Sequence, residues 1–484
     1  MSRKEGARTG GRKEGRSDGM TRREAVKAAG AVGVAVSVAK TVKAEAPAFI
    51  KKVHAANNQV NYGIIGTGGR GQYLLGLLKS VDNGKCVAIC DVDDENLNKG
   101  LLAIGGSPKK YKDYRQLLAD SSVESVLIAT PVYLHYPMLE DALKAGKHVF
   151  CEKSLVFTEE EVNKVKALYP AQHPKQVLQV GLQRRYSEYY TAVKQMIEKG
   201  MLGDVQFIYA QWHRNPGWVM KPNQWRLFRK TSGGLAAELG SHHFDVADWM
   251  FGSTPEMVMG LGGLDTMHDG RDIYDNIQLI FKYPKGKKMI WSGSSSTSHL
   301  PLFGGSRSEQ GEMICGTGGT VHITIGSGKM DPDPPLAIWY REPSPPPKVT
   351  PGGKPEKFQA GASFSLASGG KALPILLSGD QRTGSESFLE KELKFARQWL
   401  YAKGVMVPNE ARNPVTVSLE SFFNDCKTGG KPKANVEVGL DDSISVILAN
   451  RAMDEERRVK YAELHHPAAT PATTPAAKKK AATT

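Results

Sequence analysis

A cluster of glycines early in the chain has the residue types and spacing of a phosphate-binding turn. Residues 63–71 read GIIGTGGRG, and the glycines that follow the apolar start are Gly66, Gly68, Gly69 and Gly71. Gly66 would permit a tight turn, Gly68 would let the backbone approach a pyrophosphate, and Gly71 would let a helix pack closely on a strand. We therefore expect a dinucleotide to bind at this turn.

The elements expected around the turn are those that a dinucleotide site requires. An apolar strand is expected over 62–65, a helix follows the glycines, and the apolar stretch 86–91 predicts a second strand that ends at Asp91. The helix N-terminus would hold the phosphates, and Asp91 would accept hydrogen bonds from the adenosine ribose. A carboxylate there favours NAD over NADP, although Arg70 could weaken that preference.

Two further strand ends carry polar residues that a bound ligand could contact. Residues 125–138 (SVLIATPVYLHYPM) and 142–155 (ALKAGKHVFCEKSL) each contain an apolar strand pattern bounded by helical segments. Such alternation predicts a parallel sheet with helices on both faces, and ligands bind beyond the carboxyl ends of its strands. The residues expected at this edge, as cofactor contacts, are Thr130, Pro131, His135, Glu152 and Lys153.

The stretch 236–252 (AAELGSHHFDVADWMFG) places three ionisable residues at helical spacing. Glu238, His242 and Asp245 lie four and three residues apart, so they share one face of a helix, whereas His243 points about 100° away. Histidine titrates near neutrality and therefore suits proton transfer. A histidine packed at a helix start and a metal site are the alternatives; no metal is expected.

Aromatic and cationic residues gather in 211–234 (QWHRNPGWVMKPNQWRLFRKTSGG). Indole rings stack on the C–H faces of a sugar ring, and guanidinium groups bond to its hydroxyls, so Trp212, Trp225 and Arg226 are candidate carbohydrate contacts. Arg184 and Tyr186 follow a strand end and are expected in the same cleft. The alternative is an aromatic core beneath a loop.

Charge and composition exclude several classes of protein. The net charge is +14, but residues 1–60 hold 13 Lys/Arg against 5 Asp/Glu, and the tail from Leu464 adds three lysines. The part expected to fold is nearly balanced, so nucleic-acid binding is not supported. We expect no membrane span, because uninterrupted apolar runs are too short. The five cysteines show no CxxC spacing, which argues against a disulfide framework or a zinc site.

Both ends of the chain are expected to lie outside the folded part. In 1–46, Arg22 and Arg23 precede an apolar run and an A-x-A pattern, which resembles a twin-arginine export signal and predicts a periplasmic or exported protein. A basic arm in a cytoplasmic protein is the alternative. A linker is expected over 47–59, a Pro/Gly-rich insertion at about 326–385, and a disordered tail over 464–484.

Several ordered motifs together resemble the glucose–fructose oxidoreductase and inositol dehydrogenase (Gfo/Idh/MocA) family. They include the glycine turn, GKHVFCEKS (146–154), SGGLAAELGSHHFDVADW (232–249) and YDNIQLIFKYPKG (274–286), and the likeness covers about 60–460. The resemblance implies an α/β protein with a Rossmann domain (60–180). It also implies an α/β domain (181–463) with a large, mostly antiparallel open sheet that mediates homo-oligomers, and a final helix that returns near the first domain.

The resemblance also implies roles for single residues. Lys153, His242 and Glu238 become the catalytic residues, and the two histidines at 242 and 243, Lys153 and Asp245 are expected to contact substrate. Ser154 stands where the family has a proline, which removes a residue able to hold the preceding peptide bond cis, and Glu238 stands where the family has an aspartate.

The function implied is NAD(P)-dependent oxidation of a sugar or glycoside hydroxyl by hydride transfer. Because free NAD is expected to be scarce outside the cytoplasm, an exported enzyme would hold its cofactor tightly and run redox-balanced chemistry. An NAD-dependent glycosidase, lyase or epimerase that oxidises its substrate transiently is therefore the first alternative. A non-catalytic sugar- or NAD-binding protein is the second.

Overall fold

The computed structural model describes residues 59–214, 218–221, 224–296, 310–325, 336–341, 373–376 and 412–465. The expected export signal, nearly all of the linker and nearly all of the C-terminal tail lie outside these residues. Within the described part of the chain, no helix is long and apolar enough to cross a membrane.

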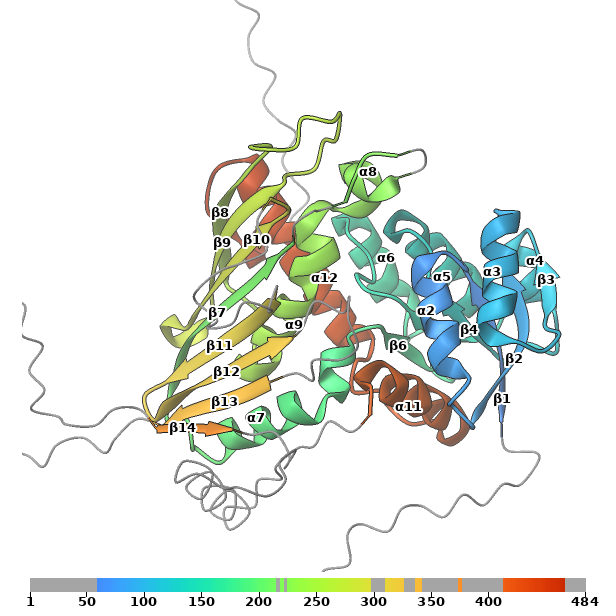
Figure 1. Cartoon of the computed structure of the whole chain (residues 1–484), viewed down its shortest axis with the longest axis horizontal. Coiled ribbons are helices and arrows are strands. Elements are labelled where there is room, and N and C mark those ends of the chain that lie inside the picture. Colours follow the sequence, from blue (N-terminus) through green and yellow to red (C-terminus); the bar gives the residue numbers. More distant parts are fainter. Residues whose placement is uncertain are drawn as a thin grey trace, which may run out of the picture. The chain divides into compact units, whose positions relative to one another are not determined.

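The first domain is a parallel six-stranded sheet with helices on both faces, as expected for a Rossmann domain (Figure 1). The strand order is β3-β2-β1-β4-β5-β6, and all neighbouring pairs are parallel. The strands are β1 (Val60–Ile65), β2 (Gly84–Cys90), β3 (Lys109–Tyr111), β4 (Ser125–Ile128), β5 (His148–Cys151) and β6 (Leu178–Val180). The helices are α2 (Gly69–Leu78), α3 (Asp94–Ile104), α4 (Tyr114–Ala119), α5 (His135–Lys144) and α6 (Glu159–Leu168). β4 is buried at every residue because helices cover both faces of the sheet, so it reads as a continuous apolar run after Ser125.

The second domain is built on a nine-stranded sheet, counted over the described residues, in the order β14-β13-β12-β11-β7-β10-β9-β8-β15. Only the β7–β10 neighbours among them are parallel. The strands are β7 (Val205–His213), β8 (Met257–Gly263), β9 (Asn276–Lys282), β10 (Lys288–Ser294), β11 (Gln310–Gly316), β12 (Gly319–Ile325), β13 (Leu336–Arg341), β14 (Leu373–Leu376) and β15 (Val459–Lys460).

The range 326–385 is not only an insertion of Pro/Gly-rich loop. Strands β13 and β14 fall within it and extend one edge of the second sheet. The proline-rich composition around them conceals these two short strands from pattern reading. The rest of the range lies outside the described residues.

One face of the second sheet packs on helices α7 (Glu188–Glu198) and α9 (Ser241–Phe251), and the other face carries the outward side chains. β9 alternates strictly between buried and exposed residues, the pattern of a strand with one covered face. The core beneath it contains Phe244 of α9, whose ring lies 4.6 Å from the Phe281 ring and 5.4 Å from the Trp291 ring. This packing fixes α9 against the sheet.

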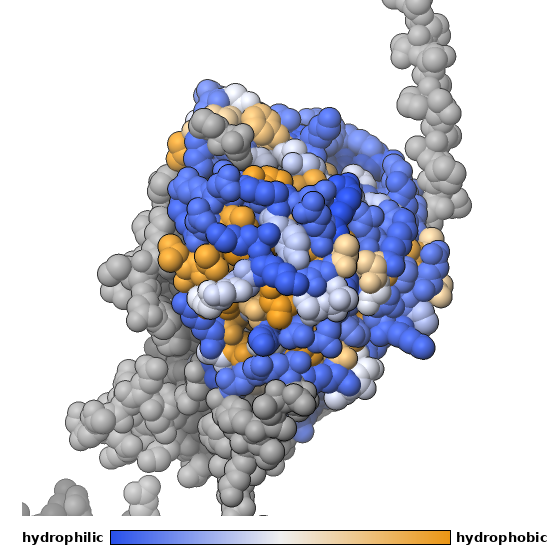
Figure 2. All heavy atoms as spheres, turned by 90° about the vertical axis from the view of Figure 1, so that its right-hand side faces the viewer, coloured by the Kyte–Doolittle hydropathy of each residue, from blue (hydrophilic) through white to orange (hydrophobic). Residues whose placement is uncertain are grey.

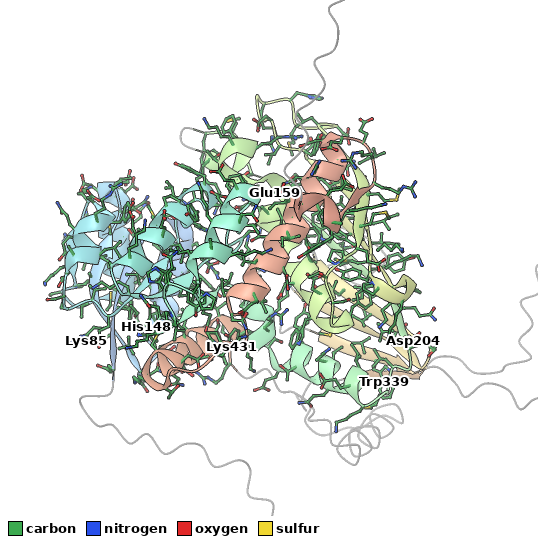
Figure 3. The ribbon with its side chains drawn as sticks, turned by 180° about the vertical axis from the view of Figure 1, so that it is seen from behind. Lys85, His148, Glu159, Asp204, Trp339 and Lys431 are labelled. Carbon is green, nitrogen blue, oxygen red and sulfur yellow. The ribbon has the colours of Figure 1, made fainter. Side chains whose placement is uncertain are left out.

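The last two described helices join the domains, as expected for the end of the chain. α11 (Pro414–Thr428) packs on the first domain, where Phe423 stacks on Tyr62 at 5.2 Å between ring centroids. α12 (Val436–Asp454) contacts α6 and β6 of the first domain and α9 and β8 of the second (Figure 3). Buried residues occur all around α12, so it is a core helix between the two domains.

The surface on the side of the first domain is mostly hydrophilic, with hydrophobic residues in small groups (Figure 2). Two of the most exposed apolar side chains of this domain are Val92, after β2, and Leu102, on α3. Scattered exposure of this kind is ordinary for a protein surface.

Candidate active site

The β1–α2 turn has the shape that the glycine spacing predicted. Gly66 has φ +91°, and a Cβ there would lie 2.8 Å from the Ala129 carbonyl oxygen. A Cβ at Gly71 would lie 2.0 Å from the Gly66 carbonyl oxygen. Both positions therefore require glycine, one for backbone conformation and the other for the close contact of α2 with the turn.

The other two glycines leave space in front of the helix. A Cβ at Gly68 or Gly69 would meet no atom of the described residues within 4 Å. Gly68 caps α2 without a side-chain hydrogen bond, and the first turn of α2 contains no acidic residue. Its N–H groups are thus available to an anion, and these features fit the pyrophosphate of NAD.

Asp91 lies at the same edge of the sheet, directly after β2, and two backbone N–H groups bond to its carboxylate. The Thr67 N–H donates to Asp91 Oδ2 at 2.7 Å, and the Asp93 N–H donates to Oδ1 at 2.9 Å. Oδ2 also accepts from the Thr67 hydroxyl at 3.3 Å, so Oδ1 is the oxygen that keeps a lone pair for a ribose hydroxyl. Asp91 is therefore oriented for the ribose contact that its position after β2 predicts.

Arg70 does not pair with Asp91. Its Nε donates to Glu152 Oε1 at 2.8 Å, and the guanidinium lies 5.1 Å from the centre of the Tyr73 ring. Glu152 is buried, so this ion pair ties the glycine turn to the end of β5. The suggestion that Arg70 weakens the preference for NAD has no support from this arrangement.

His135 lies at the expected edge of the sheet, but its ring connects the loop after β4 to the loop after β5. Its side chain is buried, Nδ1 lies 2.8 Å from the Ser154 carbonyl oxygen, and Nε2 lies 3.1 Å from the Thr130 carbonyl oxygen. Burial lowers the pKa of His135. The interpretation of His135 as a cofactor contact is corrected accordingly, because both ring nitrogens face the backbone. Thr130 and the adjacent Pro131 remain half-buried at the strand end.

Lys153 reaches from the loop after β5 to the second domain. Its Nζ donates to the Glu238 carbonyl oxygen at 2.7 Å and to the Ala237 carbonyl oxygen at 3.2 Å. Burial lowers the pKa of Lys153, an effect that the Glu238 and Glu152 carboxylates oppose. The Lys153–Ser154 peptide is cis, so the expectation that Ser154 removes a cis bond is wrong.

Both carbonyls belong to η4 (Ala236–Gly240), a π-helical turn that leads into α9. The Glu238 side chain is buried and accepts a hydrogen bond from Arg226 Nε at 3.1 Å. The Arg226 guanidinium lies 4.3 Å from the Trp225 ring centre and 5.7 Å from that of Trp218. Trp225, Arg226 and Glu238 thus form one connected wall beside the lysine contact.

His242 is a neutral imidazole packed on an indole. Its ring lies 5.6 Å from the Trp212 ring at an interplanar angle of 33°, and its Nδ1 has no hydrogen-bond partner among the described residues. Burial lowers the pKa of His242 well below its usual value, and the Lys153 and Arg184 cations lower it further. His242 is therefore a neutral imidazole at neutral pH, and its Nδ1 is buried without a partner among the described residues.

A buried carboxylate contacts His243, the residue next to His242. Glu312 of β11 lies 2.7 Å from His243 Nδ1, accepts from the Tyr190 hydroxyl at 2.7 Å, and pairs with Arg184. All four side chains are buried. This cluster was missed in the sequence, where a single acidic residue within the apolar run 310–316 was its one signal.

Three residues expected to contact substrate have their partners elsewhere. Arg184 bonds to Glu312, and Arg184 also donates to the His242 carbonyl oxygen at 3.4 Å, so it supports α9 from behind. Asp245 pairs with Arg185 at 2.7 Å, and the Tyr186 hydroxyl accepts from the Ala434 N–H at 3.4 Å. Their sequence positions predicted proximity, but the helix turns and the α11–α12 connection direct these side chains into the interior.

Two family models match the chain. Residues 60–182 match an oxidoreductase family described as an NAD-binding Rossmann fold, and residues 190–322 match the GFO/IDH/MocA C-terminal domain. An uncharacterised oxidoreductase of Bacillus subtilis is 30% identical over 42% of this chain and 57% of its own length. An inositol 2-dehydrogenase of Rubrobacter xylanophilus is 28% identical over 56% of this chain and 73% of its own. A 2,7-anhydro-N-acetylneuraminate hydratase of Escherichia coli is 27% identical over 54% and 70%.

Solved structures share the fold over most of the described chain. An aldose–aldose oxidoreductase from Caulobacter crescentus, complexed with glycerol, has a TM-score of 0.60 at 19% identity, covering 83% of this chain and 99% of its own. A scyllo-inositol dehydrogenase from Lactobacillus casei, with bound NAD(H) and scyllo-inositol, has a TM-score of 0.56 at 19% identity, covering 84% and 99%. With a glycine cradle that fits NAD and both family domains matched in order, the chain belongs to the GFO/IDH/MocA family of NAD-dependent oxidoreductases.

Proposed function

We propose that the protein oxidises a hydroxyl-bearing carbon of a sugar or cyclic polyol. The observation that carries this proposal is the contact of Lys153 with η4, the turn that leads into α9, at the strand edge that holds the glycine cradle. NAD, when bound, supplies the hydride acceptor. The protein supplies the base, the positive charge and the walls of the substrate site.

The two catalytic side chains have complementary states. His242 is neutral, so it accepts the hydroxyl proton of the substrate. Lys153 keeps two of its protons on backbone carbonyls and presents the third to the oxygen that becomes negative, which stabilises the transition state. Glu238 is the third residue of the proposed site. Its backbone carbonyl holds Lys153, and its carboxylate forms an ion pair with Arg226.

The walls of this site suit a polyhydroxylated ring. Trp212 packs beside His242, and Trp225 and Arg226 lie beside Glu238, so indole faces and guanidinium donors flank the lysine. A sugar presents C–H faces to such indoles and hydroxyls to such donors. The relatives named for inositol oxidation support a cyclic polyol as the first substrate class to test.

Redox-balanced chemistry is the second candidate. The hydratase and the aldose–aldose oxidoreductase among the similar proteins support it, since both names describe reactions without net oxidation. In this version an oxidised carbon acidifies the neighbouring C–H bond, and His242 or Lys153 removes that proton. A sugar- or NAD-binding protein without catalysis is the remaining candidate, and it would bind both ligands without transferring hydride.

The proposal includes export and assembly into homo-oligomers. Export rests on the twin-arginine pattern in 1–46 and requires that the cofactor be loaded before transport. Assembly through the second sheet is supported by an apolar row on its outer face: Tyr209, Ile290, Ile280 and Met259 are neighbours in register across four strands.

The first experiment is to denature the purified, untreated protein and assay the supernatant for NAD(H) and NADP(H). Near-stoichiometric NAD supports a trapped cofactor and the redox-balanced version; an empty protein that reduces added NAD with myo-inositol supports an ordinary dehydrogenase. Lys153→Met and His242→Asn should each lower turnover at least ~100-fold, a typical loss for a proton-transfer group. Full turnover in Lys153→Met would contradict the role given to the lysine.

A further inference from the structure

A carboxyl group without a partner is buried in α12, the helix between the two domains. Asp442 is 0% exposed, and neither of its oxygens has a hydrogen-bond partner among the described residues. Buried side-chain oxygens are nearly always bonded, and an ionised carboxylate without a partner is costly to bury. Burial raises the pKa of Asp442 well above its usual value, which favours the protonated carboxyl.

The turn of α12 that carries Asp442 packs on the segment that directly follows Lys153. On the same helix, Ser443 Oγ accepts a hydrogen bond from the Val156 N–H at 3.3 Å, and a Cβ at Gly439 would lie 3.3 Å from Leu155. These contacts place the Asp442 turn of α12 against the residues that directly follow Lys153. The two groups also act on each other electrostatically, since each stabilises the charged form of the other.

Two more carboxyl groups with unused oxygens act on Asp442 electrostatically. Asp245 and Asp248, on α9, are buried, and Oδ2 of each has no partner among the described residues. The remaining oxygen of Asp245 pairs with Arg185, and that of Asp248 accepts from the Tyr283 hydroxyl at 2.6 Å. The charges that act on Asp442 are those of Asp245, Asp248, Lys153 and Arg185.

This row of carboxyl groups reaches a cavity. Asp245, Asp248 and Asp441 line a cavity of about 290 Å³, together with half-exposed residues such as Lys194 and Ser253. Burial raises the pKa of Asp441 to about 6, so this group exchanges protons near neutral pH. Asp442, which interacts electrostatically with Lys153, therefore also interacts with two carboxyl groups that line this cavity.

We propose that Asp442 is a proton-transfer residue that connects Lys153 to this cavity. The inference rests on the proposed function. In the oxidation, the C–H bond breaks and its electron pair leaves as hydride to NAD, while the O–H bond breaks and its proton passes to His242, which hands it to Lys153 as the lysine ammonium gives up one of its own protons. Lys153 gives a proton to Asp442, directly or through water, as Asp442 passes its own to Asp245 or Asp248. One proton leaves at Asp441, and Asp442 ends protonated, as it began.

Infrared difference spectroscopy of the full-length protein tests the state of Asp442 without any turnover. We expect a protonated-carboxyl band at neutral pH that Asp442→Asn removes and that Lys153→Met shifts. The absence of such a band, or a band that ignores Lys153→Met, would overturn the proposal. This result does not depend on whether any substrate is oxidised, so it separates this inference from the proposed function.

Kinetics with a polyol that the wild type oxidises provide the second test. Asp442→Asn should lower kcat at least ~10-fold and raise the solvent deuterium isotope effect on kcat, because proton release becomes slow. Ser443→Ala is the matched control: it loses a hydrogen bond on the same turn, so it should lower the melting temperature and keep the wild-type isotope effect. Wild-type kcat and isotope effect in Asp442→Asn would refute the relay. A wild type that oxidises no polyol would refute the proposed function, and the infrared result then decides Asp442 alone.

Discussion

At the residue scale, the two halves of the site depend on different kinds of constraint. The cradle needs absent side chains: Gly71 because an added Cβ would strike the turn, and Gly68 because the space before it must stay open. The proposed catalytic half contains His242 and Lys153, whose pKa values are both lowered. Burial is the largest cause of the lowering at each residue. Both demands are met by local packing.

The two glycines should respond differently to alanine. Gly71→Ala places a Cβ 2.0 Å from the Gly66 oxygen, so it should destabilise the fold by roughly 1–3 kcal/mol, as overpacking does. Gly68→Ala meets no protein atom within 4 Å, so it should keep the melting temperature and weaken NAD binding. Thermal unfolding and NAD titration distinguish these outcomes. Equal NAD affinity in Gly68→Ala and the wild type would contradict the cradle.

The pH dependence of activity follows from the same residues. The pKa of His242 lies well below 6.5, so the imidazole stays neutral as the pH is lowered toward that value. The midpoint of the acid limb of kcat/KM should therefore lie below pH 6.5. The pKa of Lys153 lies below 10.5, so the alkaline limb should fall below pH 10.5 as the ammonium loses its proton. A pH profile of kcat/KM checks both limbs. An acid limb above pH 6.5 would argue that another group is the base.

At the element scale, α9 is held in place by a buried charge cluster behind it. Glu312 of β11 bonds to Arg184, His243 and Tyr190, which come from η2 (Gln183–Tyr186), α9 and α7. One carboxylate thus connects three helical segments to the sheet. Because Arg184 also bonds to the His242 carbonyl oxygen, this cluster helps to fix the position of His242.

Removing that carboxylate should be costly. Glu312→Ala leaves the buried Arg184 guanidinium without its ion-pair partner, so we expect a loss of about 3–5 kcal/mol in the free energy of unfolding. Glu312→Gln keeps the size and two polar atoms and should lose less. Chemical denaturation measures both. A loss below ~1 kcal/mol in the alanine variant would show that the cluster does not hold α9.

At the scale of the whole molecule, α12 is buried whereas the outer face of the second sheet is exposed to solvent. α12 is buried between the two domains, which makes the first domain and the second sheet one folded unit around the site. The sheet instead exposes apolar side chains, including Leu261 at 62% and Met259 and Ile280 at 39% each. Adjacent exposed apolar residues of this kind mark contact surfaces.

A charge on that face should therefore dissociate the proposed oligomer. Ile280→Asp faces Met259 across β8 and β9, so it should place a carboxylate in the contact and shift the protein toward the monomer. Leu102→Asp, at a more exposed position on α3 of the first domain, is the control and should leave the mass unchanged. Light scattering after size exclusion reads both variants. A monomeric wild type would reject the oligomer outright.

The sequence by itself determined the first domain, because its signals are local. Glycines that permit one turn, apolar strands of matching length and an acid at a strand end are read from neighbours along the chain, and Gly66, Gly71 and Asp91 stand as predicted. The family motifs are also local, and they identified Lys153 and His242 as candidate catalytic residues. Only the tertiary structure decided which groups pair at long range: Glu312 with His243, Arg70 with Glu152, and Asp442 with no partner among the described residues. Such pairings depend on how two domains pack around α12, and spacing along the chain carries no record of that packing.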